Sequence, residues 1–253
     1  MVFGGIQKLT LLDYPEKTAC TLFTIGCNFR CPFCHNTMFL DPHVHKYGNS
    51  LSLDFPVLYD ESEILSFLKT RHGLLDGVCI SGGEPLMQNG LNSFISKVKE
   101  LGFLVKLDTN GNYPQKLAEL INSGNVDYVA MDIKNSPAKY GETIGLAAYN
   151  IAPIAESMEV LRSSSIDYEY RTTVVREFHT QDDLISIARW ITETASLSEN
   201  ADIQDKYYKY FLQGFIDSDG VLQKGLSGYT AEEMQQILGE VQKVLPTTEL
   251  RGI

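Results

Sequence analysis

Three cysteines fall within eight residues near the start of the chain, in the segment Cys27-Asn-Phe-Arg-Cys31-Pro-Phe-Cys34-His35. The whole chain has five cysteines, and an odd count with tight clustering favours a metal site over a disulfide framework. Three thiolates on one loop can bind three irons of a [4Fe–4S] cubane and leave the fourth iron without a protein ligand. Clusters with four cysteine ligands mainly move electrons, whereas an open iron can also bind a small molecule.

Three other interpretations of this cysteine cluster stay open. The run Cys31-Pro-Phe-Cys34-His35 matches the C-x-x-C-H pattern of haem attachment, although such attachment normally needs export and residues 1–14 show no leader. Three cysteines with His35 could bind a structural zinc, but adjacent Cys34 and His35 would have difficulty turning toward one tetrahedral metal. Buried cysteines without a metal are the third interpretation, and three thiols on a short polar loop bury poorly.

A second motif, Gly82-Gly83-Glu84-Pro85, follows directly on an apolar run at 77–81. Taken alone it predicts a turn, since glycine and proline mark turns. Glycines also let the backbone approach a ligand closely, because no Cβ intervenes.

The elements that must position these motifs alternate between two apolar periods. Short runs rich in β-branched residues predict six strands, at 18–25, 77–81, 104–109, 128–133, 168–175 and 207–212. Between them, helical spacing appears at Leu91, Phe94, Ile95 and Val98 and again at Leu184, Ile187, Ala188 and Ile191. Helix starts are indicated by the capping-box pairs Asp60 with Glu63 and Thr230 with Glu233, and by Pro114.

Repeated strand–helix units predict parallel strands, because each crossover returns the chain to the same edge of the sheet. They could form a doubly wound sheet or a partial (β/α)6 TIM-like barrel, and we expect the α/β partial barrel with outer helices. Functional groups would then gather at the carboxyl ends of the strands. We expect one domain over residues 1–253, with a cluster loop at 26–36 and a polar surface insertion at 39–59.

These motifs together resemble the radical S-adenosylmethionine (SAM) superfamily, in which C-x3-C-x2-C has an aromatic residue, here Phe33, before its last cysteine. Further segments, at 11–15, 23–36, 108–111, 131–134, 211–215 and 249–253, are similar to the activating enzymes of glycyl radical enzymes, especially those of anaerobic ribonucleoside-triphosphate reductase. Two positions depart from the relatives. Glu16 stands where glycine is common, and Gln213 stands where activating enzymes of pyruvate formate-lyase have histidine.

The resemblance implies a [4Fe–4S] cluster on Cys27, Cys31 and Cys34, with SAM on the open iron. Reductive cleavage of SAM would give a 5′-deoxyadenosyl radical, which abstracts a glycine Cα hydrogen from a partner glycyl radical enzyme. The resemblance also implies the contacts to SAM. The backbone of Gly82 and Gly83 and the carboxylate of Glu84 would bind the methionine ammonium, and Lys134 would bind the SAM carboxylate. Asp108 would bind the ribose, Phe33 would contact the adenine, and Gln213, at the end of the sixth strand, would lie at the same site.

Two groups have alternative roles. Similar activases bind a monovalent cation beside SAM, so Asp108, Thr109 and Asp132 could supply oxygen ligands to one. Alternatively, the two aspartates pair with Lys134 or cap helices. Arg171 lies within the fifth strand pattern and could orient SAM or the partner's glycine loop, or form a structural ion pair, because a buried arginine is rarely unpaired.

The expected partner is therefore a glycyl radical enzyme, most simply anaerobic ribonucleotide reductase, together with a low-potential electron donor such as flavodoxin or ferredoxin. The alternatives are a radical SAM enzyme acting on a small molecule or peptide, and a non-catalytic zinc or redox module. The formal net charge of −11 argues against general nucleic-acid binding. We also expect a cytoplasmic protein without a membrane span.

Overall fold

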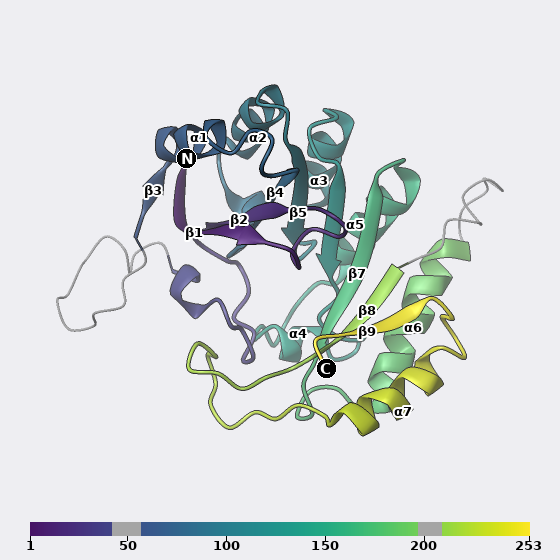
Figure 1. The fold of residues 1–253 in the computed structure, drawn as a ribbon. Coiled ribbons are helices and arrows are strands. Elements are labelled where there is room, and N and C mark those ends of the chain that lie inside the picture. Colours follow the sequence, from purple (N-terminus) through teal and green to yellow (C-terminus); the bar gives the residue numbers. More distant parts are fainter. Residues whose placement is uncertain (42–56, 197–208) are drawn as a thin grey trace. The chain divides into compact units, whose positions relative to one another are not determined.

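The computed structural model describes residues 1–41, 57–196 and 209–253 (Figure 1). Its elements in chain order are β1 (Val2–Thr10), β2 (Ala19–Thr24), η1 (Thr37–Phe39), β3 (Tyr59–Asp60), α1 (Glu61–Lys69), β4 (Gly77–Gly82), η2 (Pro85–Met87), α2 (Leu91–Glu100), β5 (Leu104–Thr109), α3 (Pro114–Asn122), β6 (Tyr128–Asp132), α4 (Tyr140–Thr143), α5 (Ala152–Ser163), β7 (Asp167–Val174), α6 (Gln181–Ser196), β8 (Lys209–Gly214), α7 (Ala231–Val241) and β9 (Thr248–Arg251).

The chain divides into two compact units. The first comprises Met1–Asn28, Asn36–Thr109 and Lys116–Val129, and the second comprises Phe29–His35, Asn110–Gln115 and Ala130–Ile253. Because Cys27 lies in the first unit and Cys31 and Cys34 lie in the second, the expected cluster loop crosses the division. The single domain over 1–253 stays a prediction.

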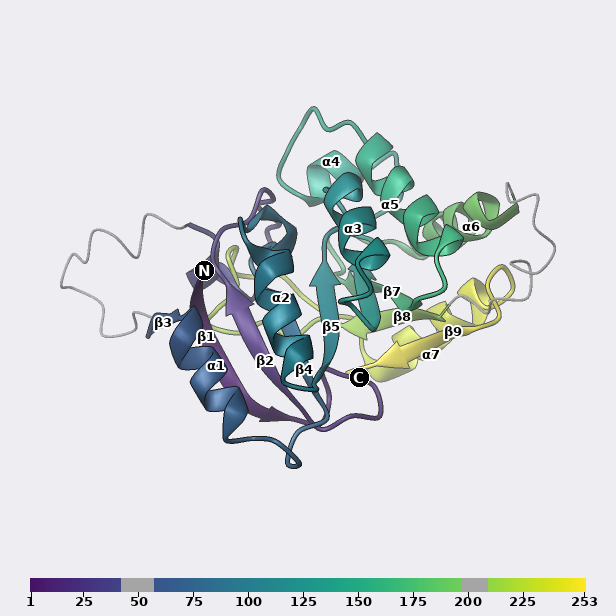
Figure 2. The same cartoon turned by 90° about the horizontal axis from the view of Figure 1, so that it is seen from above.

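The first unit is a sheet with helices on one face. Its strands lie in the order β3-β1-β2-β4-β5, with β2, β4 and β5 parallel and β1 antiparallel to both of its neighbours. Helices α1 and α2 cover this face (Figure 2). Phe3 of β1 packs on Phe94 of α2 with ring centroids 4.9 Å apart, and Leu22 and Ile80 are fully buried. Because side chains alternate between the two faces of a strand, the residues between these apolar ones point to the other face of the sheet, where polar groups can lie.

The second unit contains the end of β6, from Ala130 onward, followed by β7, β8 and β9 in that order, and β7, β8 and β9 are parallel. The Ile133 N–H, just past β6, donates to the Arg171 carbonyl of β7 at 2.8 Å. Helix α6 neighbours α5 and α7, and α7 also contacts β9. Tyr170, Tyr210 and Leu212 are buried on the alternating positions of β7 and β8.

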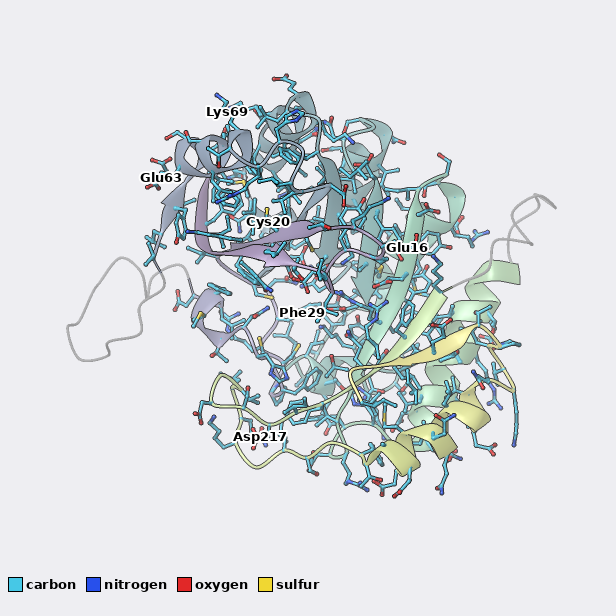
Figure 3. All side chains as sticks on the ribbon, in the orientation of Figure 1. Glu16, Cys20, Phe29, Glu63, Lys69 and Asp217 are labelled. Atoms are coloured by element: carbon cyan, nitrogen blue, oxygen red, sulfur yellow. The ribbon has the colours of Figure 1, made fainter. Side chains whose placement is uncertain are left out.

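The predicted helix starts are confirmed. The Asp60 carboxylate accepts from the Glu63 N–H at 2.9 Å while the Glu63 carboxylate accepts from the Asp60 N–H at 2.8 Å, which satisfies two donors that an open helix end leaves unpaired. Thr230 and Glu233 form the same arrangement before α7. Figure 3 labels Glu63 in the first turn of α1 and Lys69 in its last, the charge order that the helix dipole favours.

The six predicted strands correspond to β2, β4, β5, β6, β7 and β8, and the predicted ends differ from the observed ones by at most two residues. Residues 207–208 of the last prediction, and residues 42–56 of the predicted insertion, lie outside the described residues. Strands β1, β3 and β9 were not predicted, because β1 contains Gly4, Gly5 and exposed polar residues, β3 has two residues and β9 reads Thr-Glu-Leu-Arg. Such strands lack a continuous apolar run.

The turn between β1 and β2 explains the departure at Glu16. Its backbone φ is 60°, the left-handed region that glycine adopts without steric cost. The position therefore suits the glycine that relatives often have. Among the described residues, no helix combines the length and apolar composition needed to cross a membrane.

Candidate active site

The loop after β2 carries the three clustered cysteines, and none of them forms a disulfide. In the first unit, the Cys27 N–H donates to the Leu40 carbonyl at 3.3 Å. In the second unit, the Cys34 N–H donates to the Cys31 carbonyl at 3.0 Å. Cys31 is buried, while Cys27 and Cys34 are half-buried. Backbone hydrogen bonds therefore fix the loop and leave thiol chemistry to the side chains.

The segment after β8 holds the second half of this loop. The Leu222 N–H donates to the Cys34 carbonyl at 3.1 Å, and the Gln223 N–H donates to the Pro32 carbonyl at 2.8 Å. His35 packs its ring on Phe215, with centroids 5.3 Å apart. Burial lowers the pKa of His35 more than the nearby Asp217 raises it, so a neutral ring is favoured.

The donor set fits an iron–sulfur cluster. Thiolates are the ligands that such clusters use, and each cysteine of a cubane binds a different iron, so the three need not converge on one point. Within the described residues, no three His, Cys, Asp or Glu side chains are arranged around a single ion. His35, the fourth ligand of the zinc interpretation, is engaged by Phe215 and lies 3.4 Å from the Ser218 hydroxyl.

The Gly82-Gly83-Glu84 turn lies directly against the start of the cysteine loop. The Gly83 N–H donates to the Thr24 carbonyl at 2.9 Å, and the Glu84 N–H donates to the Gly26 carbonyl at 2.7 Å. A Cβ on Gly83 would lie 2.2 Å from the Gly26 carbonyl oxygen, and one on Gly82 would lie 2.4 Å from the Thr24 nitrogen. The two glycines are therefore required by strand packing, before any ligand is considered.

Glu84 is a buried carboxylate at the start of η2. Its Oε1 accepts from the Leu86 N–H at 3.0 Å and from the Thr109 hydroxyl at 2.8 Å. The side chain thus caps the short helix and links β4 to the end of β5. Its predicted role toward the methionine ammonium stays a prediction, as does the role of Thr109.

Asp108 forms an ion pair with Lys106, two residues earlier on the same face of β5. Lys106 is 1% exposed and Asp108 is 15% exposed. Asp108 therefore takes part in an ion pair, as one of its predicted roles had it, and within the first unit its partner is Lys106, which the sequence analysis did not name. The signal for this pair in the sequence was Lys106, a lysine between the apolar residues of the predicted strand at 104–109.

In the second unit, the Asp132 carboxylate forms ion pairs with two positively charged side chains. Lys134 Nζ donates to its Oδ2 at 2.9 Å, and Arg171 Nε donates to its Oδ1 at 2.9 Å. Burial raises the pKa of Asp132, but Arg171 and Lys134 lower it by more, to about 2. Arg171 therefore forms the ion pair that was one of its two predicted roles, and its role toward SAM or the glycine loop stays a prediction.

Lys134 also lies near the cluster cysteines. Burial lowers the pKa of its ammonium, but Asp132, Cys31 and Cys34 raise it above the usual range. A lysine that stays charged beside two thiol ligands is placed to pair with an anionic group bound at the cluster. The predicted contact of Lys134 to the SAM carboxylate stays a prediction.

Phe33 and Gln213 are positioned by the second unit. Phe33 is buried and contacts the rings of Phe178 and His179, at centroid distances of 5.7 and 6.0 Å. Gln213 is half-buried on β8, in register with Thr173 of β7 and Arg251 of β9. Their predicted contacts to SAM stay predictions.

His179 was missed by the sequence analysis. It is fully buried, and its Nε2 lies 2.7 Å from the Lys134 carbonyl while its Nδ1 accepts from the Val175 N–H at 3.1 Å. These contacts require a proton on Nε2, which donates to the carbonyl. His179 thereby joins the Lys134 backbone, the end of β7 and Phe33. The sequence feature that could have singled out His179 is its position two residues before the start of α6.

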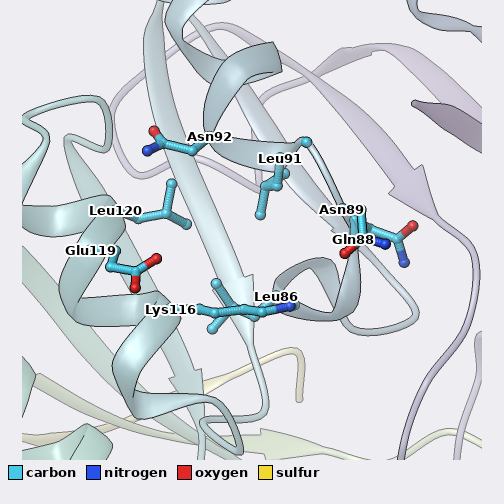
Figure 4. Close-up of a pocket in the computed structure, with 9 residues that line it drawn as sticks. Leu86, Gln88, Asn89, Leu91, Asn92, Lys116, Glu119 and Leu120 are labelled. Atoms are coloured by element: carbon cyan, nitrogen blue, oxygen red, sulfur yellow. The ribbon is translucent and has the colours of Figure 1, made fainter.

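A pocket of about 210 Å3 lies elsewhere in the first unit, beside η2, α2 and α3 (Figure 4). It is lined by Leu86, Gln88, Asn89, Gly90, Leu91, Asn92, Lys116, Glu119 and Leu120. None of the predicted site residues lines it.

A family model, the radical SAM superfamily, matches residues 21–191. The chain belongs to the radical SAM superfamily. The superfamily uses a [4Fe–4S] cluster and SAM, and Cys27, Cys31 and Cys34 fit its motif.

Two relatives of this chain differ in their named activities. A protein of Methanocaldococcus jannaschii, named as a glycyl-radical enzyme activating enzyme, is 33% identical over 196 residues, which cover 75% of each chain. A 7-carboxy-7-deazaguanine synthase of Methanopyrus kandleri is 30% identical over 118 residues, which cover 43% of this chain and 46% of that enzyme.

The solved structure of QueE from Escherichia coli matches with a TM-score of 0.57 at 13% identity, covering 100% of this chain and 94% of that one. At this identity the likeness shows the fold alone. It confirms the predicted α/β class, a partial barrel with mostly parallel strands.

The ion pairs of Asp132 with Lys134 and Arg171 predict that the free energy of unfolding falls at acidic pH. The pKa of Asp132 is depressed from 3.8 to about 2, so its charge stabilises the fold above a pH of about 4 and ceases to do so as the pH falls toward 2. The difference in unfolding free energy between wild type and Asp132→Asn should therefore shrink by about 2 kcal/mol between a pH of about 5 and about 2. Urea unfolding across this range measures it, and a constant difference would contradict it.

Proposed function

We propose that this radical SAM enzyme activates a glycyl radical enzyme by abstracting a Cα hydrogen from a glycine of that partner. The similarity over 75% of both chains to a protein named as a glycyl-radical enzyme activating enzyme carries this proposal. The partner we propose is anaerobic ribonucleotide reductase, with flavodoxin or ferredoxin as the electron donor. When bound, the reduced cluster and SAM supply the hydrogen-abstracting chemistry.

The chain's own residues bind and orient these groups. Cys27, Cys31 and Cys34 bind the cluster. In the first unit, the Gly82–Glu84 turn is hydrogen-bonded to the start of the cysteine loop, so a group bound by the turn is held at a fixed distance from Cys27. Asp108 is proposed to accept hydrogen bonds from the ribose hydroxyls.

In the second unit, Lys134 is proposed to pair with the SAM carboxylate, because its ammonium is held charged near Cys31 and Cys34. Asp132 and Arg171 hold Lys134 within this charged group. Substituting Lys134 would therefore remove both a SAM contact and part of the ion-pair network.

Electron paramagnetic resonance tests the proposal. Anaerobic mixing of the reconstituted enzyme with dithionite, SAM and ribonucleotide reductase should produce a glycyl radical doublet. With a partner whose glycines carry deuterium at Cα, the doublet should collapse and one deuterium should appear in 5′-deoxyadenosine. A partner with its radical glycine replaced by alanine should give neither signal.

A second function is favoured by the 30% identity to a 7-carboxy-7-deazaguanine synthase over 118 residues. A radical SAM enzyme for a small molecule would convert that molecule in the presence of SAM and leave every glycyl radical partner unactivated. The absence of a glycyl signal with ribonucleotide reductase and with pyruvate formate-lyase would overturn the activase proposal.

A further inference from the structure

Lys106 is a lysine on the interior of the first unit, on β5. Its side chain is 1% exposed, and Val105 and Leu107 on either side of it are fully buried on the opposite face. In the β4–β5 register it lies opposite Cys79, and its Nζ is 3.9 Å from the Cys79 sulfur. An ammonium in such a place costs free energy unless a carboxylate pairs with it.

The paired carboxylate is Asp108, at the carboxyl end of the same strand. Asp108 is more exposed than Lys106, at 15% against 1%, so the pair runs from the interior of the unit toward its surface. Lys106 cannot itself reach a ligand of ordinary size, because almost none of its surface is accessible. Within the first unit, the charged group that Lys106 contacts is Asp108, so we expect Lys106 to act on a ligand through that carboxylate.

Asp132 of the second unit follows the same pattern, since Lys134 and Arg171 both bind it. The two aspartates that could have supplied oxygen ligands to a dissolved monovalent cation therefore each hold protein cations. At Asp108, that cation is the buried ammonium of Lys106 on the same strand.

We propose that Lys106 is a positioning residue, a fixed internal cation that holds the Asp108 carboxylate in place, so that SAM binding does not need a dissolved monovalent cation at this carboxylate. This inference rests on the proposed SAM site at Asp108. It does not depend on the identity of the partner or substrate, because SAM binding requires neither.

A double-mutant cycle of Lys106→Met, Asp108→Asn and both together tests the proposal. SAM dissociation constants are measured by equilibrium dialysis with anaerobically reconstituted protein, in potassium buffer and in tetramethylammonium buffer. Wild type should bind equally in both buffers. Lys106→Met should bind at least tenfold more weakly in tetramethylammonium and regain affinity in potassium. In the Asp108→Asn background, Lys106→Met should have no further effect.

Lys99→Met is the matched control, because Lys99 of α2 pairs with Asp127 at 2.6 Å, and this carboxylate accepts from the Val105 N–H near the start of β5, whereas Asp108 lies near the end of that strand. It should change neither the affinity for SAM nor its dependence on potassium. Circular dichroism and iron content check that each variant folds and carries its cluster.

Two results would overturn the inference. One is a wild type that loses tenfold or more in SAM affinity without potassium, which would show that a dissolved cation is used. The other is a folded Lys106→Met with wild-type affinity in tetramethylammonium. Lys106→Gln is the second variant if the methionine variant does not fold, and if neither folds the wild-type comparison decides. A missing glycyl radical with normal SAM binding would instead count against the proposed activase function.

Discussion

Replacing Cys31 by alanine is expected to abolish assembly of a stable cluster and, with it, cleavage of SAM. Cys31 is one of only three cysteines in the motif, so no spare thiol of the loop can replace it. Loss of an outer partner of a metal ligand typically costs about 10- to 100-fold in affinity or activity, and loss of a ligand itself should exceed that. Iron and sulfide content and the 5′-deoxyadenosine formed with dithionite measure the effect.

Cys20→Ala is the matched control for this prediction. Cys20 is fully buried in β2 (Figure 3). Burial raises the pKa of its thiol to about 12, because this effect outweighs a backbone hydrogen bond that lowers the pKa. It is therefore a neutral core residue at physiological pH. Its replacement should cost about 1 kcal/mol of stability and leave the iron content unchanged. Full iron and SAM cleavage in Cys31→Ala would refute the proposed ligand set.

Replacing Gly83 by alanine is expected to damage both stability and SAM cleavage. The added methyl carbon would lie 2.2 Å from the Gly26 carbonyl oxygen, a backbone atom that cannot move without breaking the Glu84 N–H bond to the same carbonyl. We expect a loss of about 3 kcal/mol in unfolding free energy, in the range of severe packing changes. Moving the turn by about 1 Å should lower SAM cleavage roughly 100-fold.

Gly239→Ala separates this packing effect from the general effect of removing a glycine. Gly239 lies within α7, and a Cβ there would meet nothing within 4 Å. Alanine should stabilise this helix by about 0.5–1 kcal/mol and leave SAM cleavage unchanged. Chemical denaturation and a 5′-deoxyadenosine assay of both variants measure the contrast. Equal behaviour of the two variants would show that the close approach of Gly83 to Gly26 is unimportant.

The outcome for the ion pairs shows what sequence patterns predict and what they do not. Asp108 and Asp132 were predicted from motifs that lie at strand ends, and both lie at strand ends in the structure. Their partners were predicted incompletely, since Lys134 was named and Lys106 was not. The pairing of Asp108 with Lys106 depends on the burial of β5, which a local pattern does not contain.

The sequence alone determined the cysteine motif, the glycine-rich turn, most of the parallel strands and the helix starts, because spacing, alternation and capping are properties of neighbouring residues. Only the tertiary structure decided which long-range contacts support them. His179 reaches the Lys134 carbonyl from 45 positions along the chain, and Gly83 is fixed by a carbonyl of the β2 loop. Such contacts arise when distant strands pack side by side, and no local pattern records which residues will meet.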